Sequence, residues 1–203
     1  MVPCVYCLDI GELRDEQVLL RGRDLYLCAP RGQLVEGYLV IAPYRCVGCL
    51  GMLPREQFVE LQRFKNIVSA FYANVYGVRH AMFYEQGRAG RNGSSESFPL
   101  HAHLCGLPLS TDIHSALTGR YASKALSGID GLAEESGPYV YVETSDAVRL
   151  YHGSEDLERM RLKPRIAAAL GMPERGHWRD HPGDAELARL IARFTTFRER
   201  STP

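Results

Sequence analysis

The sequence predicts an α+β fold in which one main helix accompanies a sheet. Short runs rich in β-branched and aromatic residues alternate with turn residues, which is typical of sheet strands. Apolar residues recur at helical spacing over residues 54–76 and indicate one long helix. With 203 residues, the chain suffices for one domain with additions and a sizeable core.

The N-terminal half contains the main helix and most of the expected strands. Pro54 suits the first position of the helix, and Gly77 ends it, so the apolar stripe between them is expected to pack into the core. The expected strands cover residues 24–28, 37–42, 80–84 and 99–107.

The C-terminal half is less informative. A short helix is expected within residues 111–127, followed by a loop with helical turns. Two strand-like runs around residues 144–146 predict a hairpin. Amphipathic spacing predicts helices at residues 163–170 and 184–197.

The charge of the chain is balanced, with 24 basic and 24 acidic residues. A chain without net charge has no global field that attracts nucleic acid or an anionic membrane. No run of about 18 apolar residues is long enough to span a bilayer, and the first residues lack the order of a signal peptide. We therefore expect a cytoplasmic protein without a membrane partner, and nucleic acid is disfavoured as a partner.

Two histidines, His101 and His103, stand one apolar residue apart. On a strand both imidazoles would point to one face, whereas Ala102 and Leu104 would point to the other, into a core. Paired imidazoles can serve as nucleophile and supporting group, or can bind a metal. The pattern also fits a half-buried strand whose histidines only satisfy hydrogen bonds.

Six cysteines include two CxxC pairs, Cys4/Cys7 and Cys46/Cys49. Thiolates at this spacing can reach one tetrahedral zinc ion, so two pairs suggest a four-ligand structural site. Chance spacing of buried cysteines is the simpler alternative. A redox pair is disfavoured, because no thioredoxin-like βαβ pattern surrounds either motif.

A polar, glycine-rich loop over residues 85–95 ends shortly before His101. Backbone amides freed by glycine can cradle a phosphate, and Arg88 and Arg91 add positive charge. The loop therefore suggests a phosphate close to the histidines.

Taken in order, these motifs resemble the histidine-triad (HIT) superfamily of nucleotide hydrolases and transferases. The matching pieces, within residues 4–108, are the first CxxC pair, residues 37–46, the main helix, Glu85-Gln86-Gly87 and His101-Ala102-His103-Leu104-Cys105. The resemblance implies a bent antiparallel sheet that carries the main helix, in a catalytic core at residues 1–110 with an N-terminal zinc knuckle. Residues 111–203 would form a C-terminal extension of hairpin and helices, packed on the core as a wall of the pocket or a homodimer contact.

The resemblance also implies catalytic roles. His103 would attack an α-phosphate and form a covalent nucleotidyl-imidazole, while the backbone carbonyl of His101 would hold the other ring nitrogen. Cys105 stands where the third histidine of the triad is usual, and a thiol is a poor proton donor to a leaving group. Glu36 is the acidic residue that could substitute in holding the ribose hydroxyls. The implied phosphate contacts are Gln86, Gly87, Arg88 and Ser97.

Zinc-bearing relatives within the superfamily imply a structural zinc ion as cofactor. Its ligands in this chain would be Cys4, Cys7, Cys46 and His101, with Cys49 as the competing fourth ligand. Cys46 replaces a histidine that is usual there, and a thiolate also ligates zinc.

The implied activity is a nucleotidyl or phosphoryl hydrolase or transferase that acts on a nucleotide or nucleotide-sugar-like small molecule. Three alternatives stay open. The chain could be a zinc-containing binding protein whose catalysis lapsed through Cys105, or a nucleic-acid-binding zinc module, which the balanced charge disfavours. Alternatively, His101, His103 and Cys105 could together hold a catalytic metal.

Overall fold

The computed structural model describes residues 6–8, 13–87, 101–109, 111–152, 157 and 160–201. Within these residues the centre of the molecule is a sheet of eight strands, in which every pairing is antiparallel. The strand order is β1-β2-β3-β5-β4-β7-β8-β6. The predicted α+β class is therefore confirmed.

The elements of the described chain are mostly short. The strands are β1 (Val18–Arg21), β2 (Leu25–Cys28), β3 (Leu39–Pro43), β4 (Met82–Gly87), β5 (Leu104–Leu107), β6 (Ala122–Ala125), β7 (Tyr139–Glu143) and β8 (Val148–His152). The helices are α1 (Gln57–Phe71), α2 (His114–Leu117), α4 (Leu162–Ala169) and α5 (Asp184–Ser201). Single turns of other helix types are η1 (Asp15–Gln17), η2 (Leu50–Met52), η3 (Tyr72–Tyr76), η4 (Ile129–Leu132) and η5 (Pro173–Gly176).

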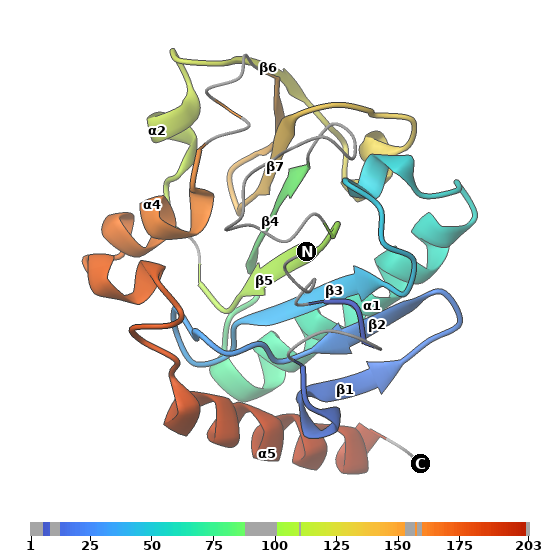
Figure 1. Cartoon of the computed structure of the whole chain (residues 1–203), viewed down its shortest axis with the longest axis vertical. Coiled ribbons are helices and arrows are strands. Elements are labelled where there is room, and N and C mark those ends of the chain that lie inside the picture. The colour runs from blue at the N-terminus through green and yellow to red at the C-terminus, as the bar shows by residue number, and fades with distance from the viewer. Residues whose placement is uncertain are drawn as a thin grey trace.

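Both faces of the sheet are buried, and each has its own hydrophobic core. Because strand side chains alternate, Leu25 and Leu27 of β2 face the core under α1 and α5, whereas Tyr26 and Cys28 face the core under α2 and α4. In Figure 1, α5 runs along the bottom of the molecule, α1 lies behind the sheet and α4 lies to the left. The histidines and the cavity described below lie on the α4 side.

The main helix is confirmed, with different ends. Pro54 precedes α1 by one turn, and its carbonyl accepts the backbone N–H of Gln57. Gly77 ends the helical run as expected, after the π-helical turn η3, and its φ of 70° is the left-handed value that favours glycine. Thus residues 54–76 contain α1 and η3.

The C-terminal half continues the sheet of the N-terminal half. β7 and β8 form the expected hairpin, and β7 pairs with β4. The expected helix within residues 111–127 is only the one-turn α2, because residues 122–125 pair with β8 as the edge strand β6. The division at residue 110 stays a prediction. No helix of the described chain is long and apolar enough to cross a membrane.

Two strand boundaries differ from the prediction. β5 begins at Leu104, so His101 and His103 lie in the extended segment before it, not on the expected strand. The chain leaves the register with β3 there, because the N–H of Ala102 donates to the carbonyl of Val47. β4 extends to Gly87, so the first residues of the expected loop 85–95 are strand.

Candidate active site and metal centre

Two hydrogen bonds hold the histidine segment against the end of β3 and the chain that follows it. Nε2–H of His101 donates to the carbonyl of Pro43 at 2.6 Å, and the N–H of Ala102 donates to the carbonyl of Val47 at 2.7 Å. His101 is buried, with 1% of its surface exposed. These bonds bring Cys46, between Pro43 and Val47, close to the imidazole of His101.

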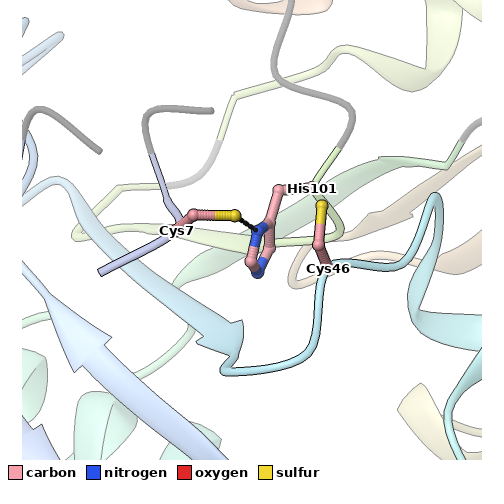
Figure 2. A group of neighbouring side chains, drawn as sticks. All are labelled: Cys7, Cys46 and His101. Atoms are coloured by element: carbon pink, nitrogen blue, oxygen red, sulfur yellow. Dashed lines mark hydrogen bonds between the residues drawn. The ribbon is translucent and has the colours of Figure 1, made fainter. Parts of the chain in front are cut away.

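Three of the predicted ligands lie together. The ligand atoms of Cys7, Cys46 and His101 are all within 4.8 Å of one another, a group that we name the thiol–imidazole cluster. Figure 2 shows the imidazole of His101 flanked by the two cysteines, and Sγ of Cys7 lies 3.5 Å from its Nδ1. Cys7 is positioned in part by Tyr26, whose hydroxyl donates to the carbonyl of Tyr6 at 2.5 Å.

The donor set of this cluster fits a zinc ion. Because a carbonyl can only accept, the bond to Pro43 places the ring proton of His101 on Nε2, and Nδ1 carries the lone pair on the side of Cys7. Thiolates and imidazole are the ligands that zinc prefers in structural sites. Cys4 lies outside the described residues. Cys49 lies apart from the cluster, since its thiol donates to the carbonyl of Glu135 at 3.7 Å.

His103 has the hydrogen bond that the HIT resemblance implies. Its Nδ1–H donates to the carbonyl of His101 at 2.7 Å, so the neutral ring carries its lone pair on Nε2. The ring of Tyr6 packs against it, with 4.6 Å between the centroids. Ala102 and Leu104 point into the core under α1, as the alternation predicts.

Cys105 is a buried, neutral thiol. Burial raises its pKa to about 11, and its Sγ lies 3.1 Å from the hydroxyl of Tyr38. Tyr84 donates to the same hydroxyl at 3.4 Å. Within the described residues, His101 groups with Cys7 and Cys46 rather than with His103 and Cys105, so the geometry favours the structural site over a metal held by His101, His103 and Cys105.

His103 and Cys105 open into a cavity of about 380 Å³. Both halves of the chain line it. The described lining residues are Tyr6, Leu13, Gln17, Pro30, Arg31, Tyr38, Tyr84, Gln86, His103, Cys105, Arg161, Leu162, Lys163, Pro164, Gly176, His177, Trp178, Arg179 and Asp180.

Positive charge dominates this lining. Four of the described lining residues are cationic, against the single carboxylate of Asp180; they are Arg31, Arg161, Lys163 and Arg179. Arg31 also pairs with Asp184 at 3.1 Å, and the guanidinium of Arg179 stacks 4.5 Å from the ring centre of Trp178. A cavity with this excess of cations suits an anionic ligand.

Of the two predicted phosphate contacts that the structure describes, one lines the cavity and the other does not. Gln86 lines the cavity, and its amide donates to the carbonyls of Leu157 and Met160 at 3.2 and 2.5 Å. Gly87 is a buried strand residue outside the described lining, and a Cβ there would meet the ring of Tyr139 at 2.6 Å. Its lack of a side chain therefore serves packing. Arg88 and Ser97 lie outside the described residues.

Glu36 does not reach the cavity. Its carboxylate pairs with Arg189 at 2.6 Å and with Arg193 at 3.1 Å, both on α5. The hydroxyl of Tyr76 donates to it at 3.4 Å. The expected role toward a ribose is therefore wrong, and Glu36 instead anchors the C-terminal helix.

A buried carboxylate, Glu85, supports the loop that carries the second CxxC pair. It accepts the N–H of Leu50 and the hydroxyl of Tyr139, each at 2.7 Å. Burial raises its pKa to about 7, against the lowering effects of these hydrogen bonds and of His103. The loop is thereby tied to β4 and β7.

Sequence reasoning missed several residues of the cavity. Tyr38 lies two residues before Val40, the residue opposite Cys105 in the sheet, so strand alternation could have placed it beside the thiol. The sequence around Lys163 gave no such indication, because the pattern of an amphipathic helix does not show whether its first residues line a cavity. Trp178 also lines the cavity.

The chain matches known proteins over most of its length. A family model described as "protein similar to CwfJ C-terminal" matches residues 1–115. CWF19-like protein 1 of Xenopus laevis is 22% identical over 189 residues, which cover 88% of this chain and 34% of the frog protein. The chain thus spans about a third of that relative's length.

Among solved structures, the crystal structure of the C. elegans NitFhit protein is 18% identical with a TM-score of 0.41. That likeness covers 48% of this chain and 23% of the other, and is too slight to assign a fold. The family match is stronger evidence, because 115 of 203 residues exceed half of the chain. The chain therefore belongs to the family of proteins similar to the C-terminal region of CwfJ.

Proposed function

We propose that this chain is a HIT-like nucleotidyl or phosphoryl hydrolase or transferase. Its substrate is a nucleotide or nucleotide-sugar-like molecule, and His103 forms a covalent intermediate at a phosphate of that molecule. The bond from Nδ1–H of His103 to the carbonyl of His101 carries this proposal, because it orients the ring at the wall of a cationic cavity.

The hydrogen bond makes His103 a suitable nucleophile. With the proton held on Nδ1 by an accepting carbonyl, the lone pair of the neutral imidazole is on Nε2. The packed ring of Tyr6 restricts its rotation. An imidazole oriented in this way needs no general base before it attacks phosphorus.

The reaction then proceeds in two displacements. Nε2 of His103 attacks phosphorus, the P–N bond forms, and the P–O bond to the leaving group breaks with its electron pair on that oxygen. Water, phosphate or another acceptor next attacks phosphorus, and the P–N electron pair returns to Nε2. Cationic residues of the lining stabilise the negative charge of the phosphoryl group in both steps.

A zinc ion would have a structural task beside this chemistry. Cys7, Cys46 and His101 would hold it, with Cys4 as the proposed fourth ligand. It would join the N-terminal segment to the histidine segment.

Intact-protein mass spectrometry tests the proposal. Wild type, His103→Ala and the exposed control His80→Ala are incubated with nucleotides and nucleotide sugars and are quenched without acid, because the P–N bond is acid-labile. We expect a nucleotide monophosphate adduct on wild type and on His80→Ala, and none on His103→Ala. An adduct that persists in His103→Ala would contradict the proposal.

A second candidate is a zinc-containing binding protein without catalysis. It is favoured by Cys105, whose raised pKa prevents it from replacing the third histidine as an acid. This candidate predicts nucleotide binding by calorimetry without turnover or adduct in the same panel.

A further inference from the structure

We propose that Lys163, on the C-terminal helix α4, is a second catalytic residue that exchanges a proton with the leaving and attacking groups opposite His103. The proposal rests on the proposed function and extends it to a residue beyond the family match, which ends at residue 115. A two-step transfer from a poor leaving group needs an acid that protonates the departing oxygen, and His103 does not supply one.

The residues beside the thiol of Cys105 cannot supply that acid at neutral pH. Burial raises the pKa of Cys105 to about 11 and raises the pKa of both Tyr38 and Tyr84 well above its ordinary value. The three groups also bind one another, through Sγ–hydroxyl and hydroxyl–hydroxyl contacts of 3.1 and 3.4 Å. They form a neutral floor under the cavity.

Lys163 lies directly on this floor. Its Nζ is 4.9 Å from the ring centre of Tyr38, whose hydroxyl contacts Cys105, and it donates to the carbonyl of Gly32 at 2.7 Å. An ammonium carries three N–H donors, so the bond to Gly32 orients the group without using its full donor capacity. Lys163 and His103 both line the cavity.

The electrostatics of Lys163 suit proton exchange. Burial lowers its pKa to about 8, opposed by the nearby thiol of Cys105. A group with a pKa near the working pH can act both as an acid and, once deprotonated, as a base. An arginine at the same place would carry charge but could not give up a proton.

The proton balance closes over the two steps. As His103 forms the P–N bond, the ammonium of Lys163 gives one proton to the departing oxygen and becomes a neutral amine. When water attacks phosphorus, the amine takes one proton from it, and the P–N electron pair returns to Nε2. Both groups end in their starting states.

A leaving-group comparison tests the role of Lys163. The probes are the p-nitrophenyl and ethyl esters of the four ribonucleoside 5′-monophosphates. The p-nitrophenolate group leaves without being protonated, whereas the ethoxide group needs a proton as it leaves. We expect Lys163→Met to slow adduct formation at least about 100-fold with the ethyl ester and only a few-fold with the p-nitrophenyl ester. Lys163→Arg should behave like Lys163→Met, and Lys124→Met, at a partly exposed lysine outside the described lining, should behave like wild type.

The p-nitrophenyl ester also serves as the internal control for folding. Equal slowing with both esters, or full rescue by Lys163→Arg, would overturn proton exchange by Lys163 and leave the nucleophile in place. A wild-type chain that forms no adduct with either ester would overturn the proposed function and this proposal together.

Discussion

Two regions meet at the segment from His101 to Cys105, and they are built in different ways. The thiol–imidazole cluster takes its described members from short motifs of the family-matched half of the chain. The cavity beside it takes much of its cationic wall from residues 161–164 and 176–180, where no motif pointed to a site. The family-matched half thus supplies His103 and Arg31, and the remainder of the chain supplies the other three cationic residues of the described lining.

The two regions depend on different interactions. The cluster depends on donor chemistry and on local backbone bonds to Pro43 and Val47. The wall of the cavity depends on contacts between the turn after β2 and distant segments, such as the bond from the N–H of Gly32 to the carbonyl of Pro182 at 2.6 Å. Variants should therefore damage one region without the other.

The largest effect should follow from removing a metal ligand. We expect Cys46→Ser to lose bound zinc, from one ion per chain to none, and to lower the free energy of unfolding by at least about 3 kcal/mol, or roughly 10 °C in Tm. Cys49→Ser is the matched control and should keep the ion, because Cys49 lies apart from the cluster. Elemental analysis measures the zinc content of each variant, and thermal unfolding measures its stability. Zinc loss in Cys49→Ser but not in Cys46→Ser would reverse the ligand assignment.

The next effect should come from Glu85, which ties the loop of the second CxxC pair to the sheet beside His103. Its folded pKa of about 7 lies above the ordinary value of 4.5, so the folded chain holds this proton more tightly than the unfolded chain. The resulting stability is present below about pH 4.5 and is lost as the pH rises through about 7, a change of roughly 3 kcal/mol.

Denaturant unfolding of wild type and Glu85→Gln from about pH 5 to 8 checks this dependence. The variant cannot titrate at this position, so the difference in unfolding free energy between the two proteins should change across that range. Glu56→Gln, at an exposed carboxylate, should track wild type at each pH. A pH-independent difference for Glu85→Gln would refute the raised pKa.

The smallest effect should follow from disturbing the wall of the cavity at Gly32. This glycine has a φ of 77°, and a Cβ would overlap the Cβ of Trp178 and lie 2.9 Å from Nζ of Lys163. We expect Gly32→Ala to weaken nucleotide binding and to cost about 1–2 kcal/mol of stability beyond the control Gly119→Ala. That control has a φ of 88°, and a Cβ added there would meet no other atom within 4 Å. Equal behaviour of the two variants would show that the wall tolerates displacement.

Much of the fold was predictable because its elements have local signatures. The stripe that forms α1, the hairpin of β7 and β8, and the amphipathic α5 follow from periodicity in the chain. β6 was not predictable, since its exposed Ala-Ser-Lys-Ala residues have little strand preference and are held by backbone pairing with β8. The histidines precede β5 rather than lying on it, because their segment bonds to the chain after β3.

Residue types and short spacings were enough to predict the candidate groups of the site, because two CxxC pairs and a His-x-His segment contain Cys7, Cys46, His101 and His103. The surroundings of those groups were decided by contacts across the fold. Lys163 donates to the carbonyl of Gly32, 131 residues away in the chain, and Glu36 pairs with Arg189 of α5, 153 residues away. Such contacts leave no periodic or local pattern in a sequence, because only the packed sheet and helices bring their partners together.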